Sequence, residues 1–294
     1  MTIAEQEDVQ ALIALAKSED LGGGDISADL LADRDEQGEF RLVAREAGVF
    51  AGREIAGAVL AAYHDDIALE WTDAGVDGSA VSERDPSLAV LRGPVGPILS
   101  AERVLLNFLQ RLSAIATLTR RYVDAVAGTS AAIFDTRKTT PGWRTLEKYA
   151  VRCGGGRNHR FGLYDAVLIK DNHLAGIAPA RLASAVFDML NALSQAPRRP
   201  SFVEVEVDTL EQLEALLAVV GIDVILLDNF SPERLRDAVA MRDAFGLAGK
   251  VALEASGGVD LDSVRAIAET GVERISVGAI THSAAALDLS LERC

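Results

Sequence analysis

The sequence predicts an α/β fold, and two observations in its second half carry that prediction. From residue 131 onward, six short apolar runs each end in polar or glycine residues, at 131–134, 166–169, 202–207, 224–227, 251–253 and 274–277. Helical patterns lie between them, such as 210–219, 232–245 and 262–270. Buried strands that alternate with helices are typical of a parallel sheet. Polar residues gather where the strands end, as in an α/β barrel, although periodicity alone leaves an open, doubly wound sheet as a competing topology.

The first half of the chain predicts a smaller α/β layer. Residues 2–17 have the pattern of an amphipathic helix, with Thr2 and Glu5 in a capping-box arrangement. Short strand-like runs follow at 40–44, 49–51 and 89–91, with a helical piece at 54–63. Residues 100–126 form the longest helical pattern, and apolar side chains at helical spacing indicate its buried face.

Composition narrows the class of protein. The chain has 294 residues, of which 49% are hydrophobic and 25% charged, as in ordinary globular proteins. A net charge of −15 and a pI near 4.7 make nucleic acid an unsuitable partner. No apolar run approaches the ~20 residues of a membrane span, and the acidic N-terminus lacks the apolar core of a signal peptide, so we expect a cytoplasmic protein. Cys153 and Cys294 show no ligand spacing, which predicts reduced, incidental thiols.

One stretch of the sequence, residues 135–173, concentrates positive charge. It holds eight Lys or Arg residues and four acidic ones, a net +4, so the rest of the chain carries −19. Such a concentration suits a multiply charged anionic substrate. After Arg137 and Lys138, the residues Thr140 and Pro141 predict a helix start, as its N-cap and first helical position. The free N–H groups of that helix would lie beside the cations and favour a phosphate or carboxylate.

The residues that follow the predicted strands describe one composite site. Cations come first, then two carboxylates, then two glycine-containing turns: Thr136, Arg137, Lys138, Lys170, Glu206, Asp228, 254–258 and 276–278. This order fits an anionic acceptor, a metal-bound diphosphate and a sugar phosphate, because glycine turns bring backbone N–H groups close to a phosphate. Alternation places Glu204 and Glu206 on one face of their strand, where buried carboxylates need partners. No spacing of His, Cys and carboxylate residues predicts zinc.

Three sequence motifs in this region together resemble those of the quinolinate phosphoribosyltransferase family, the decarboxylating nicotinate-nucleotide pyrophosphorylases. They are TRKTTPG at 136–142, GGGRNHR at 154–160 and LIKDNH at 168–173. The resemblance extends across nearly the whole chain. It implies an N-terminal α/β sandwich domain over 1–116, with 280–294 expected to pack back on it, and an incomplete α/β barrel with parallel strands over 117–279. It also implies the reaction: quinolinate and phosphoribosyl diphosphate give nicotinate mononucleotide, diphosphate and carbon dioxide in de novo NAD biosynthesis.

The resemblance also implies roles for individual residues. Glu206 and Asp228 are expected at the phosphoribosyl diphosphate and its Mg²⁺, directly or through that substrate. The same substrate is expected to contact the two turns, Ser256, Gly257, Gly258, Ser276, Val277 and Gly278. The carboxylates of quinolinate are expected to contact a set of cations and their neighbours: Thr136, Arg137, Lys138, His159, Arg160 and, from a neighbouring subunit, Arg103. Lys170 is expected to stabilise the leaving diphosphate, and Lys138 is a candidate to protonate the ring carbon. A homodimer or higher homo-oligomer with shared active sites follows from the same resemblance.

Alternatives stay open at this point. A Schiff-base barrel aldolase or decarboxylase could use Lys170 as its nucleophile, because a lysine that ends a buried strand suits that chemistry. A phosphoribosyltransferase with a different acceptor, or a non-catalytic anion-binding protein, would share much of the pattern. Asp228 could instead cap the helix that begins at Ser231 and Pro232. Of the two histidines in the matched motifs, His159 and His173, the second is the better candidate for a structural role.

Overall fold

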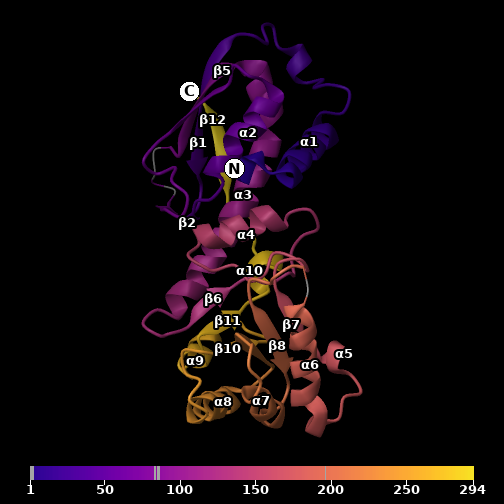
Figure 1. Cartoon of the computed structure of the whole chain (residues 1–294). Helices are drawn as coiled ribbons and strands as arrows, with labels where there is room; N and C mark the ends of the chain where they lie inside the picture. Colours follow the sequence, from indigo (N-terminus) through magenta and orange to yellow (C-terminus); the bar gives the residue numbers. More distant parts are fainter. Residues whose placement is uncertain (1–2, 83, 85–86, 196) are drawn as a thin grey trace. The chain divides into compact units, whose positions relative to one another are not determined.

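The computed structural model describes residues 3–82, 84, 87–195 and 197–294 (Figure 1). The chain forms two compact units, the first of Met1–Arg120, Lys138–Gly156 and Ile280–Cys294, and the second of Arg121–Arg137 and Arg157–Ala279. The family resemblance implied a barrel domain of residues 117–279, but within it the segment 138–156 packs in the first unit. There Trp143 stacks on Phe108 with ring centroids 4.9 Å apart, and the hydroxyl of Tyr149 bonds to Asp77.

The first unit is built on a four-stranded antiparallel sheet with the order β12-β1-β5-β3. Its strands are Gln37–Ala44 (β1), Ala68–Trp71 (β3), Ala89–Pro94 (β5) and Leu289–Arg293 (β12), and Gly48–Val49 (β2) pairs separately with Ala80–Val81 (β4). The pairing of β12 with β1 brings the C-terminal segment back to the N-terminal part of the chain. Phe40, Leu42 and Leu91 from this sheet are almost fully buried and contribute to the core.

The described helices of this unit are mostly those that the sequence predicts. They are α1 (Glu7–Leu21), α2 (Arg53–Tyr63), α3 (Val95–Ala125), which runs on into the second unit, α4 (Arg144–Cys153) and the short α10 (Ala279–His282), with 3₁₀ turns η1 (Ile3–Glu5) and η2 (Ala28–Leu30). Two predicted helix starts are wrong. Thr2 lies outside the described residues, and α1 begins only at Glu7. Gly142 has φ +80°, outside the helical range, so α4 begins at Arg144 and the N–H of Thr140 donates instead to buried Glu147.

The second unit contains six parallel strands in the order β6-β11-β10-β9-β8-β7. Each overlaps one of the six predicted runs: Ala132–Phe134 (β6), Val167–Ile169 (β7), Val203–Val207 (β8), Val224–Asp228 (β9), Ala252–Ser256 (β10) and Arg274–Ser276 (β11). The helices that follow strands are α5 (Asp171–Leu174), α6 (Leu182–Ser194, after the 3₁₀ turn Pro179–Arg181, η3), α7 (Leu210–Leu217), α8 (Pro232–Ala244) and α9 (Val264–Ala268). The parallel α/β prediction is confirmed.

Strand order decides between the two topologies that the sequence left open. Strands β7 to β11 follow one another across the sheet in chain order, and β11 then pairs with β6, the first strand. A doubly wound sheet would instead reverse its direction of growth near the middle. With β6 and β7 at the two edges, this is an incomplete α/β barrel. In the described part of the chain, no helix has both the length and the apolarity that a membrane span needs.

Candidate active site

The carboxyl ends of the parallel strands bring together residues that are far apart in the sequence. Register places Ser256 beside Asp228 and Glu206 beside Leu226, so the ends of β8, β9 and β10 meet at one edge of the sheet. The paired strands β7 and β8 end next to one another in the same way, and Lys170 directly follows β7. The polar residues predicted at the strand ends therefore lie along one edge, where barrel enzymes place their catalytic groups.

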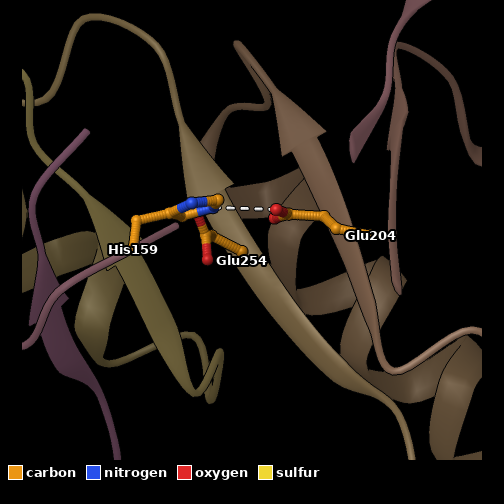
Figure 2. Close-up of side chains that lie close together, drawn as sticks. All are labelled: His159, Glu204 and Glu254. Carbon is orange, nitrogen blue, oxygen red and sulfur yellow. Dashed lines mark ion pairs between the residues drawn. The ribbon is translucent and has the colours of Figure 1, made fainter. Parts of the chain in front are cut away.

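A buried charge cluster lies within this edge. His159 lies between two fully buried carboxylates, with its Nε2 2.8 Å from Glu204 Oε2 and 3.4 Å from Glu254 Oε1 (Figure 2). Arg274 pairs through Nε with Glu254, and the hydroxyl of Ser276 donates to the same carboxylate. Arg274 also packs on the Phe134 ring, 3.9 Å from its centroid. The cluster therefore balances two carboxylates with one guanidinium and an imidazole.

The composition of this cluster also suits a divalent metal, because one ligand atom from each of His159, Glu204 and Glu254 lies within 4.8 Å of the others. Two observations favour an internal ion network instead. Arg274 already supplies a cation to Glu254, and Ser276 occupies the Glu254 oxygen that faces His159. A metal placed here would compete with a guanidinium for the same carboxylate, so we assign no metal to the cluster.

The loop that carries His159 is held by Asp135, the residue that follows β6. This fully buried carboxylate accepts the His159 N–H at 2.8 Å through Oδ1 and the Asn158 amide at 2.6 Å through Oδ2. The 157–159 loop is also bound to β6 through the backbone, because the N–H of Arg157 donates to the Ile133 carbonyl. Asp135 was not among the predicted site residues.

Two features determine where His159 carries its proton: the neighbouring carboxylates and the hydrogen bond from the Arg160 N–H. Burial alone would lower its pKa, but hydrogen bonds and charge from Glu204 and Glu254 outweigh burial and raise the pKa to about 9. Yet the Arg160 N–H donates to Nδ1 at 2.8 Å, so Nδ1 needs a lone pair and cannot carry a proton as well. Burial and the charge of Glu254 raise the pKa of Glu204. The proton that the carboxylates attract therefore lies on Nε2 or on Glu204, because geometry excludes Nδ1.

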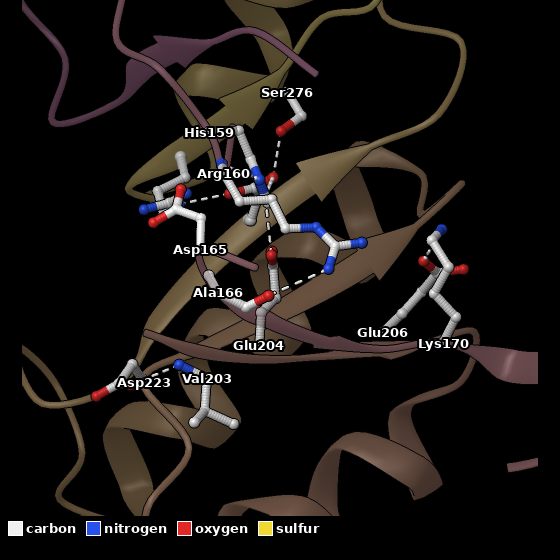
Figure 3. Close-up of polar contacts among 12 residues, drawn as sticks. His159, Arg160, Asp165, Ala166, Lys170, Val203, Glu204, Glu206, Asp223 and Ser276 are labelled. Carbon is white, nitrogen blue, oxygen red and sulfur yellow. Dashed lines mark hydrogen bonds and ion pairs between the residues drawn. The ribbon is translucent and has the colours of Figure 1, made fainter. Parts of the chain in front are cut away.

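Arg160 is a buried cation without a carboxylate partner among the described residues. Its guanidinium donates to the Ala166 carbonyl at 3.2 Å, and its side chain is only 7% exposed. Burial, followed by the charge of Arg137, lowers its pKa, and the charges of Glu204 and Asp165 oppose that effect. In Figure 3 the guanidinium points to the side on which Lys170 and Glu206 lie. The charge of exposed Arg137 acts on buried Arg160, and two cations that repel one another favour an anion from outside the protein.

Lys170 and Glu206 form the second polar group of the site. Lys170 Nζ lies 2.6 Å from Glu206 Oε2, with the lysine side chain 46% exposed and the glutamate 10% (Figure 3). The Lys170 N–H donates to His173 Nδ1 at 2.8 Å, in a capping box at the start of α5. His173 thus has the structural role that the sequence favoured for it.

The glycine turn after β10 packs against the end of β9. Gly257 and Gly258 have φ +96° and +61°, and a Cβ on Gly257 would lie 2.1 Å from Asn229 Oδ1. The Asn229 N–H donates to Ser256 O, while its side chain donates to Asp228 at 2.7 Å. The turn therefore requires glycine and fixes the residue next to Asp228.

In the turn after β11, two residues that were predicted to contact the substrate already form hydrogen bonds within the protein. The Ser276 hydroxyl bonds to Glu254, and the Val277 N–H donates to Phe134 O at 2.9 Å, continuing the ladder between β11 and β6. Gly278 follows them, one residue before the second unit ends at Ala279. Ser276 and Val277 therefore attach the turn after β11 to β10 and β6.

Arg103 and Lys138 lie in the first unit. Arg103, in α3, borders a hollow of about 310 Å³ together with Asp20, Asp25, Ile26 and Leu99. The Lys138 carbonyl accepts a bond from the Thr281 hydroxyl at 2.7 Å.

The loop that begins at Lys138 is held by a partly buried ion pair of the first unit. Arg111 and Glu147 lie 2.8 Å apart, Glu147 accepts the Thr140 N–H at 3.2 Å, and Arg111 also donates to Thr281 O. Neither Arg111 nor Glu147 was predicted to matter for the site.

The sequence contained a signal for the buried cluster, of which its interpretation used only Glu204. Glu204 lies inside a short apolar run, Arg274 begins one and Glu254 directly follows one, whereas a strand with both faces covered should be apolar. Charges in such positions need partners, and they indicate a buried network.

Comparisons with known proteins agree over the whole chain. The family model described as "Quinolinate phosphoribosyl transferase, N-terminal domain" matches residues 25–113, and that of the C-terminal domain matches residues 115–292. A nicotinate-nucleotide pyrophosphorylase [carboxylating] of Mycobacterium leprae is 46% identical over 252 residues, 85% of this chain and 84% of the relative. A probable enzyme of the same name from Bacillus subtilis is 40% identical over 274 residues, 93% of this chain and 89% of the relative. The solved nicotinate-nucleotide pyrophosphorylase of Francisella tularensis superposes with a TM-score of 0.87 at 39% identity, covering 100% of this chain and 99% of the other.

Proposed function

The chain belongs to the quinolinate phosphoribosyltransferase family, and on that premise we propose how its residues divide the work of the reaction. The enzyme transfers the phosphoribosyl group of phosphoribosyl diphosphate to quinolinate, with loss of one carboxyl group as CO₂. The products are nicotinate mononucleotide and diphosphate, and the reaction serves NAD biosynthesis.

The single observation that carries the acceptor site is the buried, carboxylate-free guanidinium of Arg160 beside Arg137. Quinolinate has two adjacent carboxylates, and the planar fork of arginine binds a carboxylate through two parallel hydrogen bonds. Arg160 and Arg137 are proposed to hold these groups and so to direct the ring nitrogen at the ribose. The pairing of His159 with Glu204 makes His159 a support of this clamp rather than one of its cations.

The phosphoribosyl diphosphate is proposed to bind where Lys170, Glu206 and Asp228 end their strands. Glu206 and Asp228 supply carboxylate oxygens, the ligand type that Mg²⁺ prefers, and they close neighbouring strands, so the donor set fits this ion. Mg²⁺, when bound there or on the substrate, would neutralise charge on the departing diphosphate. Lys170 is 46% exposed and cationic beside Glu206, which suits an ammonium that faces phosphate oxygens.

The chemistry then requires positioning and charge stabilisation without a covalent enzyme intermediate. The quinolinate ring nitrogen attacks the anomeric carbon while the bond to diphosphate breaks, and nearby carboxylates stabilise the positive charge that develops on the ribose. The electron pair released when CO₂ leaves stays on the ring carbon, where the adjacent positively charged nitrogen stabilises it, and that pair then bonds a proton. Lys138 is the proposed proton donor. The Lys170–Glu206 ion pair disfavours the Schiff-base alternative, because a nucleophilic amine must first lose its proton.

A homodimer with shared sites is the proposed assembly. Ile26 and Leu30 are 81% and 83% exposed, and Ile26 borders the same hollow as Arg103. Burial of such side chains against a second copy would stabilise a dimer and would bring Arg103 to the partner's site. Mixed dimers of Arg103→Ala and Lys138→Ala subunits test this, because one site then combines intact Lys138 with intact Arg103 from the partner. Recovered activity supports sharing, and none despite proven subunit exchange contradicts it.

The acceptor assignment has a direct test. Nicotinate mononucleotide is measured with quinolinate or nicotinate as the acceptor, at equal concentrations of phosphoribosyl diphosphate and Mg²⁺. We expect a strong preference for quinolinate, since the two guanidinium groups exceed what one carboxylate needs. Equal use of nicotinate would contradict the proposed clamp. A cytoplasmic location is also a proposal, which cell fractionation tests.

A further inference from the structure

His159 has no ring nitrogen left for a substrate. Its Nδ1 accepts the Arg160 N–H at 2.8 Å, and its Nε2 faces Glu204 Oε2 at 2.8 Å (Figure 2). The ring is 7% exposed, and its edge contacts Phe202 with centroids 5.5 Å apart. A histidine held in this way links the positions of two protein groups, one at each ring nitrogen.

Glu204 is the group at the inner end of this arrangement. It is fully buried in the middle of β8, and neither of its oxygens has a well-aligned hydrogen bond among the described residues. The 2.8 Å approach of His159 Nε2 is therefore the contact that compensates its burial. The other carboxylate, Glu254, is 3.4 Å from Nε2 and is already occupied by Arg274 and Ser276. Glu204 is thus the carboxylate nearer to Nε2.

Arg160 lies at the outer end and is held by two hydrogen bonds, one of them to its chain neighbour His159. Its N–H bonds to His159 Nδ1, and its guanidinium bonds to the Ala166 carbonyl. The N–H bond exists only while Nδ1 is unprotonated, which is the tautomer that Glu204 selects. Loss of that selection would allow Nδ1 to take the proton, and the Arg160 N–H would then face another donor.

We propose that Glu204 is a positioning residue for the acceptor, which acts through His159 on Arg160. Glu204 holds the His159 proton on Nε2, Nδ1 accepts the Arg160 N–H, and the Arg160 guanidinium is thereby fixed towards the anion. The idea rests on the proposed role of Arg160 as a quinolinate clamp. It assigns a function to a carboxylate that touches neither substrate.

The tautomer is tested first, on the wild-type enzyme without substrate. The chain has four histidines, so a spectrum of ¹⁵N-histidine-labelled protein that correlates ring nitrogens with ring protons is simple to assign, with His159→Gln identifying the His159 signals. We expect His159 to carry its proton on Nε2 alone at neutral pH. A proton on Nδ1 overturns the proposal whatever the enzyme's substrate is, so this result does not depend on the acceptor assignment.

Two variants of Glu204 then separate positioning from packing. Glu204→Leu removes the acceptor at similar volume, whereas Glu204→Gln keeps an amide oxygen that can accept the Nε2–H. Misplacement of a clamp costs about tenfold to a hundredfold. We therefore expect the KM for quinolinate to rise at least about tenfold in Glu204→Leu, with the KM for phosphoribosyl diphosphate nearly unchanged and mixed His159 tautomers in the spectrum. Glu204→Gln should restore both the KM and the single tautomer.

Glu273 supplies the matched control. It lies just before β11, at the amino end of the strand, and pairs with Arg242 at 2.7 Å in the same unit. Glu273→Leu and Glu273→Gln should leave both KM values and the His159 spectrum unchanged. Equal quinolinate KM values for Glu204→Leu and Glu204→Gln would overturn the proposal, as would equal rises in both KM values. If Glu204→Leu does not fold, the wild-type and Glu204→Gln spectra still decide, because both must show the proton on Nε2.

Discussion

Replacing Arg160 by methionine tests whether this buried cation is kept for an anion that the protein itself does not supply. In the free enzyme, Arg160 is 7% exposed, lies near Arg137, and donates to the neutral Ala166 carbonyl. Methionine matches its length and removes its charge. The substitution should therefore stabilise the fold while it removes substrate binding. Such a trade-off between stability and activity is expected where a residue is kept for function at a cost to the fold.

The magnitudes follow from these contacts. Loss of the charged hydrogen bond to Ala166 costs about 1.5–3 kcal/mol, whereas burial of an unpaired ion costs several kcal/mol. We expect a net gain in unfolding free energy of about 1 kcal/mol, or roughly 2–4 °C in Tm. Quinolinate would lose a bidentate contact, two hydrogen bonds of about 1.5–3 kcal/mol each, so its affinity should fall roughly a hundredfold or more.

Arg242→Met is the matched control, because Arg242 is also buried in the second unit but is paired. Its guanidinium lies 2.7 Å from Asp243 and 2.7 Å from Glu273. Since both partners are partly exposed, we expect Arg242→Met to destabilise the fold by about 1–3 kcal/mol, with the quinolinate KM unchanged. Urea unfolding gives the stabilities, and steady-state kinetics give the KM values. If Arg160→Met destabilises the enzyme as much as Arg242→Met does, Arg160 is a structural residue and the reasoning fails.

Three further predictions concern the metal, the lysine and the thiols. A chelator should abolish nicotinate mononucleotide formation and added Mg²⁺ should restore it, while Asp228→Asn should raise the KM for phosphoribosyl diphosphate more than that for quinolinate; metal-independent turnover would contradict the donor assignment. Borohydride added during turnover should trap no adduct on Lys170, as peptide mass spectrometry would show, because its Nζ is paired with Glu206; a trapped adduct would favour the Schiff-base alternative. Burial, followed by the charge of Asp77, raises the pKa of Cys153 to about 12, so iodoacetamide at pH 8 should label exposed Cys294 first; equal labelling rates would show that the Cys153 thiol is not shielded.

The parallel sheet and its polar edge could be predicted from the sequence, for a local reason. Each strand of the second unit lies inside an apolar run that ends in a polar or glycine residue, and parallel strands must end at the same edge. That rule was enough to bring Lys170, Glu206 and Asp228 together without knowledge of any distance. It also suggested a structural His173, whose capping role depends only on residues three positions apart.

The buried charge cluster was decided by tertiary structure. The sequence shows that Glu204, Glu254 and Arg274 interrupt apolar runs, but only the strand register places Glu254 opposite Arg274. A shift of one residue would turn these side chains to opposite faces of the sheet. The same holds for His159, whose loop becomes fixed only through Asp135, 24 residues earlier in the chain.

The division of the chain into units shows the same limit on a larger scale. Local patterns predicted the α4 helix, and the family resemblance implied that 138–156 belongs to the barrel domain, yet its contacts lie in the first unit. The partners that hold it in the first unit, Phe108, Asp77 and Arg111, lie 35 to 72 residues away. The sequence by itself thus determined which residues form strands and which strand ends carry charge. Tertiary structure alone decided which charges neutralise one another and which are left for a ligand, because that depends on contacts between segments that no local pattern records.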